Sequence, residues 1–202
     1  YLTAELGGGL QVCKHRRPVA TAKDIASVSL VKMGSGVNLL GYYMYHGGTN
    51  PDGKLTTLQE TKATGYPNDL PEKNYDFRAP VREYGQISDT LKEIKLLTYF
   101  TQDFGEEFCS LPALIPEDNP LKPDNITDLR YAYRTDGKKG YVFINNYVRL
   151  RKTPDYTDKV FSLGKTTFPK MNIASGDFFF LPCNITYGDT LVKTAFATPY
   201  CV

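Results

Sequence analysis

The side chains best suited to chemistry in this sequence follow two predicted β-strands. Glu5 ends the strand-like run 1–5 and precedes a glycine-rich segment, and Tyr43 lies in segment 42–50, which follows an apolar run from Val37. The carboxyl ends of neighbouring parallel strands meet at one edge of a sheet, where ligands bind. A carboxylate and a phenol at that edge can serve as a nucleophile and its orienting partner. The alternative is a solvated loop carboxylate and an ordinary core tyrosine.

Other kinds of catalysis lack the residues that they need. His15 and His46 are the only histidines, and neither has a motif-bearing serine or cysteine beside it, which argues against Ser-His-Asp and Cys-His hydrolases. The glycines at 7–9 lack the lysine and the spacing of phosphate-binding loops. The four cysteines are too widely spaced for a zinc knuckle or a redox pair. They are expected to be buried thiols, or, for Cys183 and Cys201, a disulfide that closes a modest loop. We therefore expect no metal and no organic cofactor.

The composition is that of an ordinary globular protein with one large or two small domains. The 202 residues carry a net charge of +2, from 24 basic and 22 acidic residues without a block of like charge. This balance argues against nucleic acid and anionic membrane surfaces as partners, and no apolar run is long enough to span a membrane. The 15 tyrosines and 11 phenylalanines provide flat rings that suit sugar faces as well as packed cores.

The chain starts within a strand-like pattern at Tyr1, without an initiator methionine. We therefore expect it to be part of a longer protein. The cellular compartment stays open: the protein is secreted or periplasmic if its amino terminus carries a signal peptide, and cytoplasmic otherwise.

Segment 1–50 predicts a strand, a helix and a second strand. Thr21–Asp24 has the pattern of a capping box, with Asp in place of the usual Glu or Gln, and apolar residues follow at helical spacing from Ile25. Glycines from Gly34 end the helix. The strand from Val37 is apolar on both faces, which is typical of parallel sheets that are covered on both sides.

Between residues 51 and 110 we expect a long polar loop and a second helix. The loop, 51–74, contains three prolines and two glycines, and long loops in compact domains usually border a site or a partner. Ser88 predicts the N-cap of a helix through about Phe104, which Gly105 is expected to end.

The hydrophobic period changes to two in the last third of the chain. Four prolines between 111 and 127 predict an interdomain linker, so the predicted domains are 1–110, the linker 111–127, and 128–202. The strand candidates are 129–134, 141–148, 160–163, 178–181 and 191–197. Turn residues between them predict an antiparallel, β-sandwich-like domain that packs, positions or binds.

Three segments resemble glycoside hydrolase family 35, the β-galactosidases. Tyr42-Tyr-Met-Tyr-His-Gly-Gly-Thr-Asn50 and Asn74-Tyr-Asp-Phe-Arg-Ala-Pro80, with Glu83-Tyr-Gly85, resemble the end of the family's catalytic barrel. Thr3-Ala-Glu-Leu-Gly-Gly8 resembles the end of its seventh strand, which carries the nucleophilic glutamate. Gly140–Arg149 resembles a β-rich segment that follows the barrel in some members. The motifs occur in the family's order, and the resemblance covers most of the chain.

The resemblance implies a fold and a site. Residues 1–110 would be the last two strand–helix units of a (β/α)8 TIM barrel, followed by the β-sandwich-like domain. Glu5 would attack the anomeric carbon of a terminal β-galactoside, and Tyr43, Tyr75 and Phe77 would line the galactose pocket. The substrate would be a galactoside or an oligosaccharide, cleaved with retention through a glycosyl-enzyme.

Two positions depart from the family pattern. Phe77 stands where the family has a second tyrosine, and Pro51 stands where it usually has phenylalanine. We therefore expect an altered pocket mouth and one sugar contact fewer. His46, Asp76 and Glu83 are expected to brace the loops rather than to take part in the reaction.

The resemblance also implies that part of the active site is absent. The family's general acid/base follows an asparagine at the end of the fourth strand, and no segment of this chain corresponds to that strand. Because a general acid/base contributes roughly 10²–10⁴-fold in rate, we expect these residues alone not to turn over substrate. The missing upstream strands of the barrel would be their partner. The alternative is a non-catalytic carbohydrate-binding or structural module that uses the aromatic side chains as a platform.

Overall fold

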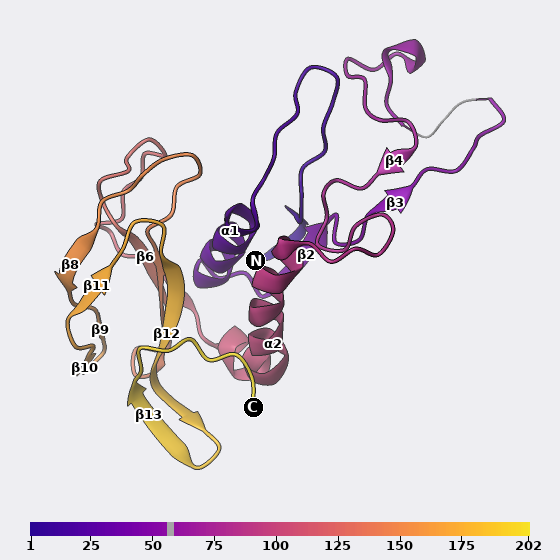
Figure 1. Ribbon diagram of the computed structural model, residues 1–202. Helices are drawn as coiled ribbons and strands as arrows, with labels where there is room; N and C mark the ends of the chain where they lie inside the picture. The colour runs from indigo at the N-terminus through magenta and orange to yellow at the C-terminus, as the bar shows by residue number, and fades with distance from the viewer. Residues whose placement is uncertain (56–58) are drawn as a thin grey trace. The chain divides into compact units, whose positions relative to one another are not determined.

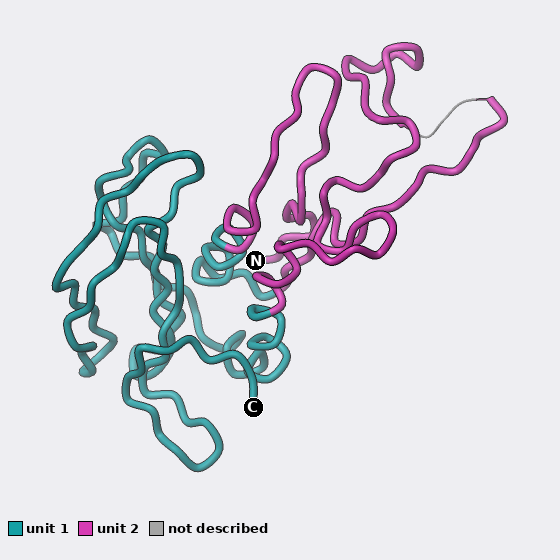
Figure 2. Tube along the Cα trace, viewed as in Figure 1, with its two compact units in different colours: residues 1, 27–38, 96–202 teal, residues 2–26, 39–95 magenta. Residues whose placement is uncertain are grey.

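The computed structural model describes residues 1–55 and 59–202 and shows a mixed α/β fold with mostly antiparallel sheets (Figure 1). Its described part contains two α-helices, α1 (Ala22–Gly34) and α2 (Asp89–Ser110), and a 3-10 helix at Lys62–Thr64. The chain divides into two compact units (Figure 2). Unit 1 comprises Tyr1, Ser27–Asn38 and Leu96–Val202, and unit 2 comprises Leu2–Ala26 and Leu39–Lys95.

Unit 1 is built on a five-stranded antiparallel sheet with the strand order β13-β12-β7-β6-β5. Its strands are β5 (Ala113–Leu114), β6 (Arg130–Thr135), β7 (Gly140–Asn145), β12 (Phe178–Tyr187) and β13 (Thr190–Thr194). The predicted turn between β6 and β7 is present. The Asp136 carboxylate accepts the backbone N–H groups of Lys138 and Lys139 at 2.8 and 2.9 Å, and Gly137 has a φ of 89°. This is the left-handed backbone that favours glycine.

The two faces of this sheet have different coverings, because successive side chains of a strand point to opposite faces. Val142 and Ile144 of β7 belong to a buried cluster with side chains from four short strands and their connections. These strands are β8 (Tyr156–Lys159), β9 (Ser162–Leu163), β10 (Thr166–Thr167) and β11 (Met171–Ile173), and they pair as β8 with β11 and β9 with β10. Tyr141 and Phe143, the alternate residues, pack against α2.

Helix α2 contributes a row of aromatic rings to this second face. Phe100 is fully buried and contacts Tyr141 edge-on with a centroid distance of 5.3 Å, and Phe104 and Phe108 follow at helical spacing. The prediction that Gly105 ends the helix is wrong, since α2 continues to Ser110. A glycine inside a helix costs only about 1 kcal/mol, which the burial of aromatic rings after it offsets.

One buried arginine joins the ends of both helices to the sheet. Arg134 of β6 is 1% exposed, and all five of its N–H groups are used. Nε donates to Leu111 O (2.7 Å), Nη1 to Met33 O (2.9 Å) and Val37 O (3.2 Å), and Nη2 to Asn38 Oδ1 (2.6 Å) and Phe108 O (3.2 Å). The guanidinium also lies 4.3 Å from the centre of the Phe108 ring. Burial lowers the pKa of Arg134, but the partial negative charge of helix C-termini favours a cation there.

The predicted linker at 111–127 is part of unit 1 and not a free connection. β5 pairs with β6, Leu111 is buried, and the Asn119 side chain exchanges two hydrogen bonds with the backbone of Tyr131, at 2.5 and 2.9 Å. The division of the chain therefore differs from the predicted domains 1–110 and 128–202. Residues 27–38 and the end of α2 belong with the β-rich part because they pack on its sheet.

Unit 2 contains the strand pair that leads to the predicted site. β1 (Leu2–Gly7) and β2 (Leu39–Tyr43) pair in parallel, and α1 lies between them in the sequence, as predicted for 1–50. The capping box is confirmed, since the Thr21 N–H and hydroxyl donate to Asp24 Oδ2 at 2.7 and 3.0 Å and the Asp24 N–H donates to Thr21 Oγ1.

The segment expected to be a polar loop at 51–74 begins and ends beside a short ribbon. β3 (Gly48–Thr49) pairs antiparallel with β4 (Asn74–Tyr75), and the Thr61 hydroxyl accepts the Thr64 N–H at the start of the 3-10 helix. Residues 56–58 of this segment lie outside the described part.

Arg134→Met is expected to destabilise the protein by about 3–5 kcal/mol, because four buried carbonyls and one amide oxygen lose the guanidinium as a donor while the side-chain volume is kept. Met33 O and Phe108 O each keep one backbone donor. Arg130→Met, on the same strand, is the matched control. Arg130 uses one nitrogen for two carbonyls, so about 1 kcal/mol is expected. Urea unfolding of both variants provides the measurement, and equal losses would contradict the role assigned to Arg134.

Candidate functional site

Glu5 lies at a bulge in β1. The parallel register pairs Thr3 with Leu40 and Leu6 with Tyr42, so that two residues, Ala4 and Glu5, stand opposite Gly41 alone. An added residue of this kind bends a strand and redirects side chains, and bulges often lie beside functional sites. The Glu5 side chain is exposed. It lies two residues before the strand ends, whereas the sequence predicts that it closes the strand.

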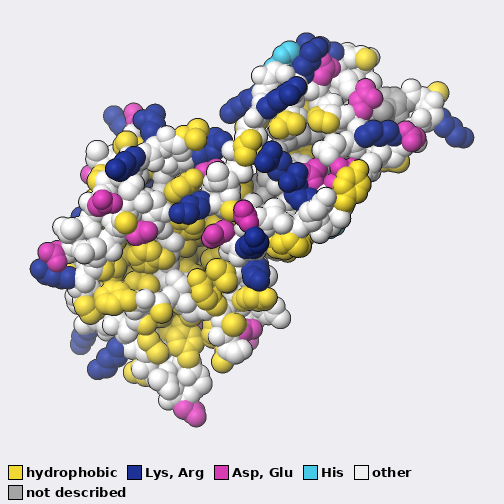
Figure 3. All heavy atoms as spheres, in the orientation of Figure 1, with side chains coloured by type: hydrophobic (Ala, Val, Ile, Leu, Met, Phe, Trp, Pro, Cys, Tyr) yellow, Lys and Arg dark blue, Asp and Glu magenta, His cyan; other side chains and the backbone are white. Residues whose placement is uncertain are grey.

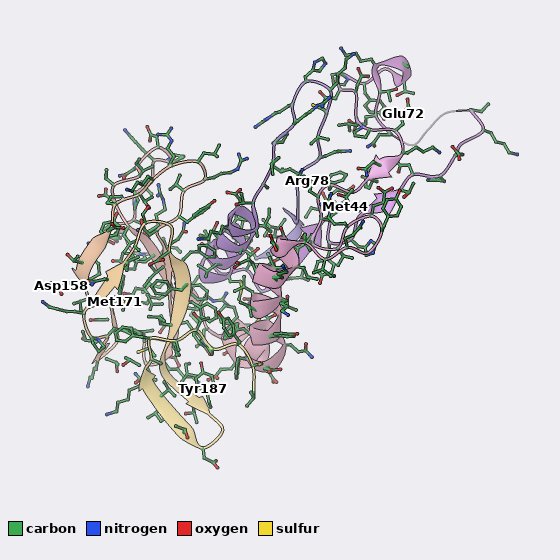
Figure 4. All side chains as sticks on the ribbon, viewed as in Figure 1. Met44, Glu72, Arg78, Asp158, Met171 and Tyr187 are labelled. Atoms are coloured by element: carbon green, nitrogen blue, oxygen red, sulfur yellow. The ribbon has the colours of Figure 1, made fainter. Side chains whose placement is uncertain are left out.

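The glycines that follow β1 are required by close backbone contacts. The Gly8 N–H donates to Tyr43 O at 3.1 Å, and a Cβ on Gly8 would lie 2.1 Å from Met44 O. A Cβ on Gly9 would lie 2.1 Å from Phe77 O. The sequence predicts a flexible loop here, and the structure shows a steric requirement instead. The glycines let β1 approach the segments that carry Tyr43 and Phe77; Met44 and Arg78, their neighbours, are labelled in Figure 4.

Tyr43, Tyr75 and Phe77 form one aromatic cluster in unit 2. The rings of Tyr43 and Phe77 meet edge-on with centroids 5.4 Å apart, and those of Tyr75 and Phe77 lie 4.7 Å apart. The hydroxyls of Tyr43 and Tyr75 share a hydrogen bond. All three side chains are half-buried, so the cluster keeps a solvent-accessible surface. The structure thus brings together the three aromatic residues that the sequence predicts to bind substrate.

The electrostatics of Tyr43 connect this cluster to Glu5. The hydrogen bond with Tyr75 is the largest of the effects that raise the pKa of Tyr43 to about 12, followed by burial and then by the negative charges of ionised Tyr75 and of Glu5. The Glu5 charge is the smallest of these effects, and it fits the register in which Tyr43 pairs with Gly7, two residues after Glu5 on β1. At neutral pH Tyr43 is fully protonated, so it can donate a hydrogen bond to an anionic group.

Asp76 holds the loop that carries Phe77. Its carboxylate is buried and accepts the backbone N–H groups of Arg78 at 3.1 Å and Glu83 at 2.6 Å, and it pairs with the Arg82 guanidinium at 2.5 Å. A Cβ on Gly47 would lie 2.8 Å from the same carboxylate. Asp76 therefore braces the loop, as the sequence predicts. Sequence reasoning missed Arg82, because its pairing with Asp76 depends on the path of the loop between the two residues.

Glu83 joins the remaining motifs. Its carboxylate accepts hydrogen bonds from the Thr49 hydroxyl and from Asn74 Nδ2, the latter at 2.5 Å. Between these motifs the backbone N–H of Gly47 donates to Val81 O at 2.8 Å. Segments 42–50, 74–80 and 83–85, which are distant in the sequence, therefore form one structure at the end of β2. His46 is exposed, and its Nδ1 contacts the carbonyl of its neighbour rather than a group of the site.

Three structural observations bear on metal binding, disulfides and membrane insertion. In the described ranges, no group of three or more His, Cys, Asp or Glu side chains could hold a metal ion. All four cysteines are free thiols, so Cys183 and Cys201 are not bonded to each other. The expectation of buried thiols holds for Cys183 and is wrong for Cys109 and Cys201, which are exposed. No helix in the described part is both long and apolar enough to cross a membrane.

No protein-family model matches the sequence, and no curated protein matches it.

Gly8→Ala is expected to destabilise unit 2 by about 2 kcal/mol or more, because the new methyl group would overlap Met44 O. Gly48→Ala is the matched control, since a Cβ there meets nothing within 4 Å. Thermal unfolding of the two variants measures the difference. A Gly8→Ala protein as stable as Gly48→Ala would show that the close approach does not exist in solution.

Tyr75→Phe is expected to lower the pKa of Tyr43 from about 12 toward its ordinary value, because the main cause of the shift is the hydrogen bond with Tyr75. The signal of Tyr43, assigned by ¹³C labelling of the tyrosine rings, is followed by NMR between pH 8 and roughly 12. Tyr45→Phe serves as the control. If the Tyr43 titration is the same in all three proteins, the hydroxyl pair is absent.

Proposed function

We propose that this chain supplies the nucleophile half of the active site of a retaining glycosidase that cleaves terminal β-galactosides in carbohydrate degradation. The observation that carries the proposal is the parallel register of β1 and β2, in which Tyr43 pairs with Gly7, two residues after Glu5. The small contribution of the Glu5 charge to the raised pKa of Tyr43 agrees with this register. The half-buried rings of Tyr75 and Phe77 beside them support a sugar pocket. The resemblance of the motifs to family 35 gives the proposed substrate class.

In the proposed reaction, a Glu5 carboxylate oxygen attacks the anomeric carbon while the bond to the leaving oxygen breaks. A general acid outside these 202 residues gives its proton to the leaving group. The same group then takes a proton from water, whose oxygen attacks the anomeric carbon and releases the sugar, so that Glu5 is regenerated. Tyr43 remains protonated, and its hydroxyl orients the nucleophile and donates to the negative charge that Glu5 carries between turnovers.

The proposed architecture is that of the last two strand–helix units of a (β/α)8 barrel followed by an accessory β-rich part. The support is the parallel pair β1–β2 with α1 between its strands and α2 after the second. Two-stranded parallel sheets are rarely stable alone, and Leu2 and Leu39 of this pair are 64% and 55% exposed. The remaining barrel strands are the proposed partner of this pair, and they would bring the acid/base carboxylate.

Phe77 changes the polar contacts that the proposed site can make with a sugar. Its ring contacts both Tyr43 and Tyr75, but it lacks the hydroxyl that a tyrosine would present to the sugar. A site of this kind loses one polar contact, and discrimination between sugars that differ in one hydroxyl falls with it. We therefore propose a looser galactose preference than the family resemblance alone implies.

A non-catalytic carbohydrate-binding or structural module is the second candidate. It is favoured by the contacts of the other two carboxylates in the motifs. Asp76 and Glu83 both form hydrogen bonds or ion pairs that hold the loops, so neither is available as a second catalytic carboxylate. Within these motifs, Glu5 is then left as a lone carboxylate, and catalysis depends on a group outside the chain.

Glu5→Gln in the complete product of the gene is expected to lower kcat on an aryl β-galactoside by at least about 10³-fold while KM changes little, since an amide cannot form the glycosyl-enzyme. Glu93→Gln, on the exposed side of α2, is the matched control. The 202-residue chain assayed alone is expected to show no turnover. Unchanged kcat in Glu5→Gln would remove the nucleophile assignment, and turnover by the chain alone would remove the need for an outside acid.

A further inference from the structure

Unit 1 has an open groove that the proposed reaction does not use. The groove has a volume of about 430 Å³ and is lined by Lys170, Met171, Asn172, Phe179, Leu181, Phe196 and Thr198. These residues come from β11 and its approach, from β12, and from the segment after β13. Figure 3 shows hydrophobic side chains gathered over this part of the surface. We call it the Phe196 groove.

The floor and walls of the Phe196 groove are fixed by the core beneath. Met171 and Leu181 belong to the buried cluster, against which Phe179 also packs. The Thr198 hydroxyl donates to Phe180 O at 2.8 Å, which holds the segment carrying Phe196 against β12. The Phe196 ring is nevertheless 59% exposed. The groove therefore presents aromatic surface that is already in position before a ligand binds, so that little conformational entropy is lost on binding.

The rim of the groove is polar but carries no unpaired charge. The Lys170 ammonium lies 3.8 Å from an Asp158 carboxylate oxygen, and the Asp158 N–H donates to Asn172 Oδ1 at 3.2 Å. Asp158 and Met171 are labelled on the neighbouring strands in Figure 4. Asn172 Nδ2 and the acceptor lone pairs of the Thr198 hydroxyl are left for a ligand.

We propose that the Phe196 groove binds a short stretch of a neutral oligosaccharide. A sugar ring has an apolar C–H face, which fits an exposed phenyl ring, and a hydroxyl edge, which needs both donors and acceptors such as Asn172 and Thr198 supply. The exposed Lys170–Asp158 pair has no net charge and so gives the groove no preference for an anionic ligand, and the polar rim makes it unsuited to a purely apolar one. The volume lies within the range of small-molecule sites, roughly 300–1,000 Å³.

The test is affinity electrophoresis of the 202-residue chain in gels that contain a neutral polysaccharide, either a β-1,4-galactan, a β-mannan, a xylan or an amylose. Retardation is expected in at least one of them. Phe196→Ala is expected to weaken that binding roughly tenfold, through the loss of buried ring surface, and Asn172→Ala to weaken it by a smaller factor. Phe196→Trp is expected to retain it. Tyr200→Ala, which removes another partly exposed ring from the same carboxyl-terminal segment but not from the groove lining, is the matched control and should bind normally.

Three results would overturn the groove proposal: no retardation in any of the gels, retardation that is equal in the wild type, Phe196→Ala and Asn172→Ala, or loss of retardation in Glu5→Gln. The result does not depend on catalysis, because Glu5→Gln is expected to be retarded like the wild type. Loss of binding in Glu5→Gln would move the binding site to unit 2 and count against the groove. A failure here and a failure of the nucleophile assignment can therefore be told apart.

Discussion

The buried guanidinium of Arg134 is the interaction on which the arrangement of unit 1 depends. It has no carboxylate partner among its hydrogen bonds, and its charge is instead met by the carbonyl ends of α1 and α2. The same group binds Val37 O and Asn38 Oδ1 at the residues just before β2 begins. One side chain of the β sheet therefore holds the ends of both helices and the two residues, Val37 and Asn38, that close this part of unit 1.

Local sequence patterns predicted the elements whose causes are themselves local. The capping box at Thr21–Asp24 predicted the start of α1, and alternation together with Asp136-Gly137 predicted the β6–β7 hairpin. The end of α2 and the pairing of β5 could not be predicted in this way. Both depend on surfaces that exist only after folding. The helix continues past Gly105 because Phe108 packs on the sheet, and the proline-rich segment forms β5 because it pairs with the edge of β6.

In the candidate site, too, local features were predicted from the sequence and features that depend on strand register or loop path were not. Residue types and their position after predicted strands identified Glu5 and three aromatic residues, and the structure brings the three aromatic rings together. The bulge opposite Gly41 and the approach of Gly8 to Met44 O follow from strand register and backbone distances, which no single-sequence pattern contains. The Asp76–Arg82 pair belongs with these, since it depends on the path of the loop between them.

The proposed reaction depends on Glu5 being the nucleophile that forms the covalent glycosyl-enzyme. The most direct measurement is mass spectrometry of the complete gene product after inactivation with 2-deoxy-2-fluoro-β-galactosyl fluoride, whose leaving group needs little help from an acid. The account predicts one 2-deoxy-2-fluorogalactosyl ester, located on Glu5. An ester on another carboxylate, or an active enzyme that hydrolyses galactosides yet never carries one on Glu5, would contradict it.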